Sequence, residues 1–321
     1  MQGHRQRSSL KPKKDATSKK DAVIDKVRIV GVPLDLGADR RGIDMGPDAL
    51  RNDGLVEELE KLGIDVQDTG NIMLPPRPPK KKYDSRLKNY EEVIFACQRV
   101  QDFVGRSIAD GYFPLVIGGD HSIAMGTTAA LSQFYNKIGI IWIDAHGDFN
   151  TEDTTITGNI HGMSFATSCG RGTKNLVGKL GVRTSVSEAN CVLIGARDLD
   201  PLERELLKKS DVTVFTMRDI DEQGMHKIMK QALKIACKGT DALHVSFDID
   251  VMDPMEAPGV GTPVQGGMTY REAHLAMEMI SECKNFKSLE VVELNPILDR
   301  QNVTGKLAIG LISSAFGKKI L

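Results

Sequence analysis

Three short polar segments of this sequence combine aspartate and histidine in a way that suits metal binding. They are 118–122 (Gly-Gly-Asp-His-Ser), 144–148 (Asp-Ala-His-Gly-Asp) and 248–250 (Asp-Ile-Asp). Each follows a short apolar run, so each is expected at the end of a strand. Alternate side chains of extended backbone point to the same side, which predicts that Asp144, His146 and Asp148 project together. The same rule applies to Asp248 and Asp250.

These carboxylate and imidazole groups, with His121 added, need a counter-charge if they are packed together. Either their pKa values shift until they are neutral, or a cation compensates them. The set contains no cysteine and has too many aspartates for one structural zinc. Mixed carboxylate and imidazole ligands suit Mn²⁺, with Fe²⁺, Co²⁺ or Zn²⁺ as competitors, and bridging carboxylates can hold two ions about 3.5–4 Å apart. Such a pair makes hydroxide near neutral pH, which predicts a hydrolase.

Each segment taken alone also has a structural explanation. The 144–148 segment can be a polar strand end with local hydrogen bonds, and aspartates are common in turns such as 248–250. The 118–122 segment can be a loop that caps the following helix. The three together, each placed after an apolar run, favour the metal site. The remaining histidines His226, His244 and His274 are given no role.

The elements that must position these segments alternate between strands and helices. Apolar runs predict strands at 27–32, 113–117, 138–143, 191–194, 212–215, 243–247 and 289–294. Helical patterns fall at 47–62, 90–109, 202–208, 217–237, 270–281 and 304–316. This alternation predicts an α/β fold with three α-β-α layers and a mainly parallel central sheet. Ligands of such sheets gather at the carboxyl ends of the strands, where the polar segments are expected.

Composition sets broad limits on the class of protein. With 321 residues, 40% hydrophobic and 26% charged, the chain can bury a large core. A net charge of −1 favours neither nucleic acid nor an anionic membrane as partner, and no apolar run is long enough to cross a bilayer. Five scattered cysteines predict reduced thiols in an intracellular, cytoplasmic protein.

The chain is expected to form a single catalytic domain over 27–321, because neither a repeat nor a linker interrupts it. Residues 1–26 are basic and almost free of apolar residues, which predicts a disordered tail. A targeting or docking arm is the alternative, although the aspartates of this tail weaken an organelle-targeting interpretation. The proline- and lysine-rich segment 74–82 is expected to be a solvated loop, with a partner-binding polyproline helix as the alternative.

These segments resemble the signatures of the arginase family of the ureohydrolase superfamily. The matching segments, in family order, are 118–122, 144–151, 246–254, 261–272 and 293–296. Both ends, 35–47 and 295–321, also resemble the family, and bacterial-type members are most similar. The resemblance spans about 27–321. It implies an arginase/deacetylase-like fold, a place in arginine metabolism, including the urea cycle, and a homo-oligomer, either a trimer or a hexamer.

The resemblance also implies two Mn²⁺ ions per subunit and their ligands. Those of one ion would be His121, Asp144, Asp148 and Asp248. Those of the other would be Asp144, His146, Asp248 and Asp250, so that two carboxylates bridge. A metal-bridging hydroxide would attack the guanidinium carbon of L-arginine, giving L-ornithine and urea. Asp148 would handle the proton of the nucleophile, and His161, which could instead be a loop histidine bonded to backbone, would shuttle protons to solvent.

Substrate contacts follow from the same resemblance. Glu293 would face the guanidinium, unless it is a strand-end glutamate paired with an arginine of the protein. Groups near the α-carboxylate, the α-ammonium and the nucleophile would be Asn150, Thr155, Thr157, Asp200, Glu203 and Thr262. Asp200 and Glu203 could also be helix-capping acids. Thr157 departs from the serine found in many arginases, keeping the hydroxyl but adding a methyl group.

Two rival interpretations remain open from the sequence. Another ureohydrolase, such as an agmatinase, guanidinobutyrase or formiminoglutamase, would share the metal ligands and differ in the loop after them. The segment 150–157 offers amide and hydroxyl donors to a carboxylate, which agmatine lacks. A metal-free pseudoenzyme acting as a scaffold is the second rival, and the retention of every ligand type argues against it.

Overall fold

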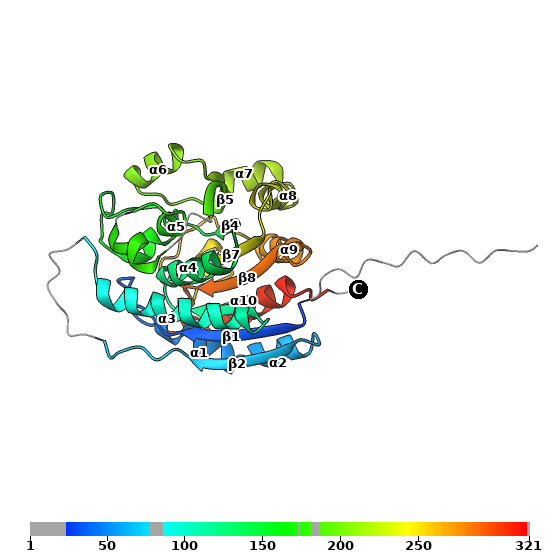
Figure 1. The fold of residues 1–321 in the computed structure, drawn as a ribbon. Helices are drawn as coiled ribbons and strands as arrows, with labels where there is room; N and C mark the ends of the chain where they lie inside the picture. The colour runs from blue at the N-terminus through cyan, green and yellow to red at the C-terminus, as the bar shows by residue number, and fades with distance from the viewer. Residues whose placement is uncertain (1–23, 78–85, 173, 182–185, 320–321) are drawn as a thin grey trace, which may run out of the picture.

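The computed structural model describes residues 24–77, 86–172, 174–181 and 186–319. These residues form an eight-stranded sheet in the order β2-β1-β3-β8-β7-β4-β5-β6, with helices on both faces (Figure 1). All of the strand pairings are parallel. The three-layer α/β arrangement with a mainly parallel sheet is therefore confirmed.

The bounds of the elements agree with the predicted ones where the apolar pattern is strong. The strands are β1 (Lys26–Val32), β2 (Asp65–Asn71), β3 (Phe113–Gly118), β4 (Ile138–Ile143), β5 (Val186–Ala196), β6 (Thr213–Thr216), β7 (Ala242–Asp248) and β8 (Phe286–Val292). The α-helices are α1 (Gly46–Asn52), α2 (Leu55–Glu60), α3 (Tyr90–Ala109), α4 (Ala124–Phe134), α5 (Ser164–Ser168), α6 (Pro201–Lys208), α7 (Met217–Gln223), α8 (Met225–Ala236), α9 (Tyr270–Ser281) and α10 (Val303–Ala315). Strand β4 and helices α3 and α9 have the predicted bounds.

Two predicted helices are each divided by a glycine. The helix predicted at 47–62 is α1 followed by α2, and the one predicted at 217–237 is α7 followed by α8. Gly54 and Gly224 have positive φ values of 95° and 80°, which interrupt a right-handed helix and which glycine adopts without steric cost. The apolar periodicity continues across both glycines because the two short helices of each pair pack against the same apolar layer.

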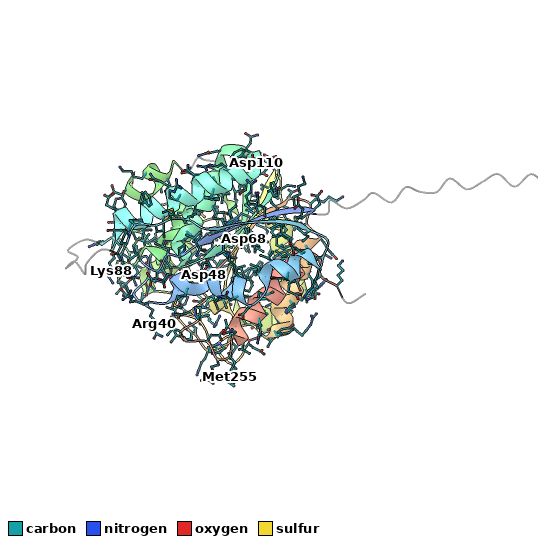
Figure 2. The ribbon with its side chains drawn as sticks, turned by 90° about the horizontal axis from the view of Figure 1, so that it is seen from below. Arg40, Asp48, Asp68, Lys88, Asp110 and Met255 are labelled. Atoms are coloured by element: carbon teal, nitrogen blue, oxygen red, sulfur yellow. The ribbon has the colours of Figure 1, made fainter. Side chains whose placement is uncertain are left out.

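Strand β2 was not predicted, because its sequence is polar. It lies at the edge of the sheet and pairs with β1. The carboxylate of Asp68 accepts a hydrogen bond from Arg51 Nε at 2.7 Å, and Arg51 also pairs with Asp48 at 3.2 Å. Figure 2 shows Asp48 and Asp68 on this side of the molecule. Charged groups of this kind suit an exposed edge strand, which has no apolar alternation to detect.

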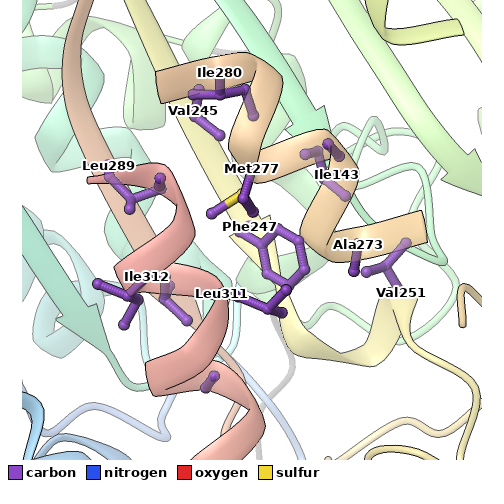
Figure 3. Packing of buried hydrophobic residues seen from close by; sticks show 14 of the residues in the cluster. Ile143, Val245, Phe247, Val251, Ala273, Met277, Ile280, Leu289, Leu311 and Ile312 are labelled. Carbon is purple, nitrogen blue, oxygen red and sulfur yellow. The ribbon is translucent and has the colours of Figure 1, made fainter. Parts of the chain in front are cut away.

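Alternate residues of the strands supply the two apolar layers. In β4, Ile141 and Ile143 belong to the layer that α8, α9 and α10 cover. Ile140 and Trp142 belong to the opposite layer, with residues of α4 and α5. Figure 3 shows the first layer, in which side chains of α9 and α10 pack over the central strands. Both faces of the sheet are therefore buried, as expected for parallel strands.

The described residues begin at Ile24, three positions before Val27. Ile24 packs against the core and β1 starts at Lys26, whereas residues 1–23, most of the predicted disordered tail, lie outside the described residues. The loop predicted at 74–82 is described only as far as Arg77. Within the described ranges, no helix combines the length and the apolar character needed to cross a membrane.

Candidate metal centre and substrate cavity

The carboxyl ends of four neighbouring central strands bring the predicted site residues together. Strands β3, β8, β7 and β4 are adjacent in this order. His121 follows β3, Glu293 follows β8, Asp248 ends β7 and Asp144 follows β4. Because the strands are parallel, their carboxyl ends share one edge, so residues far apart in sequence converge there.

The prediction that Asp144, His146 and Asp148 project together because they alternate along an extended strand is wrong. Strand β4 ends at Ile143, so Asp144, His146 and Asp148 do not project from an extended strand. Asp148 has φ 48°, in the left-handed region, and its carbonyl accepts hydrogen bonds from Phe165 and Ala166 of α5 at 2.9 and 3.1 Å. These tertiary contacts, rather than strand alternation, turn the Asp148 side chain toward the others.

One group of ligand atoms surrounds His121. Its Nδ1 atom lies 3.1 Å from a carboxylate oxygen of each of Asp144, Asp148 and Asp248. The imidazole is fully buried and stacks on Trp142, with ring centroids 4.0 Å apart. Nitrogen and oxygen donors at this spacing can coordinate one divalent ion, and His121, Asp144 and Asp248 form one group able to hold a metal.

A second group of ligand atoms adjoins the first. His146 Nδ1 lies 3.0 Å from Asp250 Oδ2 and 3.5 Å from Asp144 Oδ1. Asp144 therefore directs Oδ2 toward His121 and Oδ1 toward His146, which is the arrangement that a bridging carboxylate requires. The two groups share Asp144, one of the two carboxylates expected to bridge, whereas Asp248, the other, belongs only to the first group.

The electrostatics of these groups favour bound cations. Burial, and then the neighbouring charges of Asp250 and Asp144, raise the pKa of Asp248 well above its usual value. Burial lowers the pKa of His121, but the three carboxylates more than offset this and raise it well above the ordinary range. In the described part of the chain, no lysine or arginine forms an ion pair with these aspartates. Buried oxygen and nitrogen donors without a lysine or arginine as counter-charge fit divalent metal ions.

Glu293 lies beside this centre with one oxygen available. It is buried, with φ 68°, and its Oε1 accepts a hydrogen bond from the backbone N–H of His121 at 2.9 Å. His161 Nδ1 lies 3.1 Å from the same oxygen, whereas Oε2 is buried without a hydrogen-bond partner. Burial lowers the pKa of His161, but the hydrogen bond with Glu293 outweighs this and raises it to about 9. No arginine of the described chain pairs with Glu293, so the structural alternative for this residue is not supported.

A cavity of about 220 Å³ opens above the metal-binding groups. The predicted substrate-contact residues in its lining are Asn150, Thr155, Thr157, Asp200, Glu203 and Thr262. The predicted metal and proton-transfer residues in its lining are His146, Asp148, His161, Asp248 and Asp250. Asn159, Gly162 and Asp198 also line it and were not predicted. The lining thus contains the residues expected at the site except His121, Asp144 and Glu293, which lie outside it.

The hydroxyl groups on the cavity wall keep their protons free for a ligand. Thr155 Oγ1 accepts the backbone N–H of Gly158 at 2.9 Å, and Thr157 Oγ1 accepts that of Asn159 at 3.1 Å. A hydroxyl that accepts in this way can still donate its own proton. The wall therefore offers O–H donors to an anionic group such as a carboxylate.

Acidic groups of the cavity lining have structural contacts as well. Asn150 Nδ2 donates to Asp200 Oδ2 at 3.0 Å. Glu203 accepts hydrogen bonds from the backbone N–H groups of Phe149 at 2.8 Å and Asp200 at 3.2 Å, and it caps α6. Burial raises the pKa of Glu203 to about 8. The helix-capping interpretation of Asp200 and Glu203 is therefore correct, and both residues also line the cavity.

Arg197 is a residue of the site that sequence patterns did not single out. Its guanidinium donates to the backbone carbonyls of Asp250 at 2.9 Å and Val264 at 2.7 Å. It thereby joins the turn that carries Asp250 to the loop that carries Thr262, whose hydroxyl donates to Asp250 Oδ2 at 2.8 Å. The carbonyl partners of an arginine leave no mark in the sequence, so only the structure identifies this contact.

Fold and site together define an α/β enzyme that gathers carboxylate and imidazole ligands for metal at the carboxyl edge of a parallel sheet. The arginase family model matches residues 25–317. Arginase of Brevibacillus brevis is 48% identical over 293 residues, which cover 91% of this chain and 98% of that protein. The chain belongs to the arginase family.

Solved structures agree with this assignment. The arginase structure from Bacillus caldovelox has a TM-score of 0.89 at 44% identity, covering 92% of this chain and 100% of that chain. An Entamoeba histolytica arginase in complex with L-ornithine has a TM-score of 0.85 at 30% identity, again covering 92% of this chain and 100% of that chain.

Proposed function

We propose that this protein hydrolyses the guanidinium group of L-arginine to L-ornithine and urea. Membership of the arginase family supports the reaction. The observation that carries the proposal is a pair of metal-binding groups sharing Asp144, placed directly below a cavity rimmed by hydroxyl, amide and carboxylate groups. If the guanidinium end of L-arginine reaches the metal-binding groups, its amino acid end lies among the polar groups at the cavity mouth.

We assign two Mn²⁺ ions to the two groups of ligands. One ion is assigned to His121, Asp144, Asp148 and Asp248. The other is assigned to Asp144, His146, Asp248 and Asp250. The donors are oxygen and imidazole nitrogen without thiolate, which suits Mn²⁺. When bound, such a pair of ions supplies hydroxide at neutral pH and stabilises the negative charge that develops during attack.

Glu293 is assigned to hold and orient the guanidinium. Its Oε1 is fixed by the backbone N–H of His121 and by His161. Its Oε2 has no partner, and a buried carboxylate oxygen without a partner is costly. A guanidinium N–H would satisfy that oxygen with a charge-assisted hydrogen bond. The substrate thus completes the hydrogen bonding of a buried carboxylate that the fold leaves incomplete.

Asp148 and His161 are assigned to proton transfer. The Asp148 carboxylate lies on the cavity floor, where it can take a proton from the attacking water and give it to the departing amine nitrogen. The His161 side chain is 18% exposed and bonds to Glu293, so it lies between the floor and the solvent. An imidazole in this position can exchange the proton with water.

The amino acid end of the substrate is assigned to the cavity wall. Thr155 and Thr157, with hydroxyl protons free to donate, and the amide of Asn150 suit the α-carboxylate. The acidic groups of Asp200 and Glu203 suit the α-ammonium, whose positive charge would favour the ionised form of Glu203 despite its raised pKa. Thr262, held by Asp250, lies beside the position of the nucleophile.

Urea release is the test of this function. Protein freed of metal with a chelator is expected to release no urea, and added Mn²⁺ is expected to restore activity on L-arginine. Agmatine, which lacks the α-carboxylate, and 4-guanidinobutyrate, which lacks the α-amino group, should be much poorer substrates. Preference for agmatine would reject the substrate assignment and leave the metal centre standing. A protein that binds no Mn²⁺ and releases no urea from any of the three would instead favour the metal-free scaffold.

We further propose that the protein is a cytoplasmic homo-oligomer, a trimer or a hexamer, that acts in arginine metabolism, including the urea cycle, with the small molecule L-arginine as its partner. Resemblance to bacterial arginases is the support for this. Light scattering of the purified full chain measures its mass in solution, and a monomer would reject the oligomer.

A further inference from the structure

Behind His121, on the side away from the cavity, lies a buried group of polar residues. Ser246 and His244 belong to β7, and Glu290 and Ser288 belong to the neighbouring strand β8. All four are fully buried. Strand register places Ser246 opposite Glu290 and His244 opposite Ser288. A parallel sheet covered on both faces normally has apolar residues at such positions, so this group is unusual.

Hydrogen bonds connect this group to the metal centre. His121 directs Nδ1 toward the aspartates and Nε2 toward Ser246 Oγ, which lies 2.6 Å away. Ser246 Oγ donates to Glu290 Oε1 at 2.7 Å. His244 Nε2 lies 3.1 Å from the same Glu290 oxygen, and His244 Nδ1 lies 2.7 Å from Ser288 Oγ.

The carboxylate of Glu290 determines which group donates in each of the hydrogen bonds that link it, through Ser246, to His121. An ionised carboxylate can only accept, so the Ser246 proton must point to Glu290. The Ser246 oxygen is then left to accept from His121, so that ring carries a proton on Nε2. In the neutral ring, which is the form that binds a metal, Nδ1 therefore has no proton, and its lone pair is available to a metal ion among the aspartates.

Glu290 is held as a carboxylate by its surroundings. Burial raises its pKa, but the attraction of His244 outweighs this, so the pKa lies below its ordinary value. Its second oxygen, Oε2, is buried without a hydrogen-bond partner. A buried acid with an incomplete set of partners does not favour folding, because apolar residues of similar size would cost less. A role in the metal centre explains why the core contains it.

We propose that Glu290 is a positioning residue of the metal centre, acting through Ser246 to hold His121 with Nδ1 directed at the metal. The inference rests on the proposed function, because it requires a metal ion bound by His121. Glu290 touches neither the cavity nor the other proposed ligands, so its effect should fall on metal affinity rather than on substrate binding. Partners of this kind typically change metal affinity by about 10–100-fold.

The experiment compares variants of the full chain by titration with Mn²⁺ alone after removal of metal with a chelator. Free Mn²⁺ is measured by electron paramagnetic resonance, and emission of Trp142, the one tryptophan of the sequence, reports binding beside His121. Glu290→Gln removes the charge and Ser246→Ala removes the connecting hydroxyl. Each is expected to weaken binding of Mn²⁺ by about tenfold or more. Glu290→Asp keeps a carboxylate and should lose less affinity than Glu290→Gln.

Two further comparisons separate positioning from a general loss of packing. The double variant of Ser246→Ala and Glu290→Gln should bind Mn²⁺ about as weakly as Ser246→Ala alone, because both changes interrupt the same series of hydrogen bonds to His121. Ser313→Ala is the matched control: Ser313 is fully buried, but its hydroxyl bonds to the carbonyl of Ile309 in its own helix. This control should bind Mn²⁺ as the unaltered protein does. At saturating Mn²⁺ the KM for L-arginine should stay within about twofold in every variant.

The outcomes distinguish the inference from the function on which it rests. If the unaltered protein binds no Mn²⁺ and releases no urea, the proposed function fails. If it does both and Glu290→Gln binds Mn²⁺ equally well, only the positioning role is overturned. Ser246→Ala deletes a single oxygen and provides the same decision if Glu290→Gln does not fold. Equal losses in Glu290→Asp and Glu290→Gln, or additive losses in the double variant, would also overturn it.

Discussion

The same central strands form two regions with different roles. One is the metal-binding rim at the carboxyl ends of the strands, and the other is the apolar layer beneath α9 and α10. Phe247 and Asp248 are consecutive residues of β7. Phe247 packs in the layer with Met277 and Leu311 (Figure 3), whereas Asp248 faces His121 across the rim. A change of one position along the strand therefore separates residues that stabilise the fold from residues that serve the reaction.

The rim carries features that oppose folding, and the layer does not. Asp148 and Glu293 adopt left-handed backbone with φ of 48° and 68°, and such conformations cost about 1–3 kcal/mol each. Burial and the charge of Asp144 raise the pKa of Asp148, so its ionised form destabilises the metal-free protein at neutral pH. The comparison teaches that substitutions in the rim should remove function at little cost in stability, and substitutions in the layer should do the reverse.

The largest effect is expected from Asp148→Asn. Asparagine has the same size and tolerates left-handed backbone, so the fold should be kept. Loss of the carboxylate should lower kcat for L-arginine by about 10³-fold or more. The melting temperature of the metal-free variant should equal or exceed that of the unaltered protein, because a buried like charge is removed. The exposed Asp65→Asn on β2 is the control, with unchanged urea release. Undiminished activity of Asp148→Asn would contradict its role in proton transfer.

Leu311→Ala should give the reverse result. Leu311 is 1% exposed on α10, and truncation of a buried leucine costs about 2–5 kcal/mol of unfolding free energy. Urea denaturation measures this loss, and the kcat and KM of the folded protein should not change. Val303→Ala, at an exposed position of the same helix, should cost less than about 0.5 kcal/mol. A large change in kcat for folded Leu311→Ala would break the division between layer and rim.

His161→Ala should lower kcat by about 10²-fold, the usual loss when acid–base assistance is removed. Steady-state urea release measures the change, and the melting temperature should fall modestly, because the hydrogen bond to Glu293 that raises the pKa of His161 is lost. His226→Ala, at an exposed position on α8, is the matched histidine control and should be fully active. A loss of less than about threefold in His161→Ala would show that solvent exchanges the proton without this imidazole.

The smallest effect is expected from Thr157→Ser. Thr157 is exposed at the cavity mouth, so deletion of its methyl group should change the KM for L-arginine by less than about threefold. The hydroxyl that accepts from Asn159 is kept. A change of tenfold or more would mean that the methyl group contacts the substrate and that the rim extends to this position.

Much of the fold could be predicted because apolar periodicity is a local property. It placed β4, α3 and α9 correctly, and it failed where the pattern itself is absent. Helix α4 is buried on almost every side, so it shows no amphipathic stripe. Strand β2 is a polar edge strand without alternation.

The site could be predicted in residue types more than in geometry. Carboxylate and imidazole ligands are dictated by metal chemistry and are legible in the motifs. The left-handed turn at Asp148 was not legible, because contacts with α5 impose it. His244 was given no role, yet it pairs with Glu290 behind the metal centre. Arg197 was missed because its partners are backbone carbonyls, which every residue has.

The sequence by itself determined which apolar runs form strands and which side chains can bind metal, since both follow from residue type and local spacing. Tertiary structure alone decided that Asp144 directs its two oxygens toward different histidines and that His121 bonds to Ser246, 125 positions away. Such contacts depend on the order of the strands in the sheet. That order follows from the packing of the whole chain, because each strand finds its neighbours only when both apolar layers are buried.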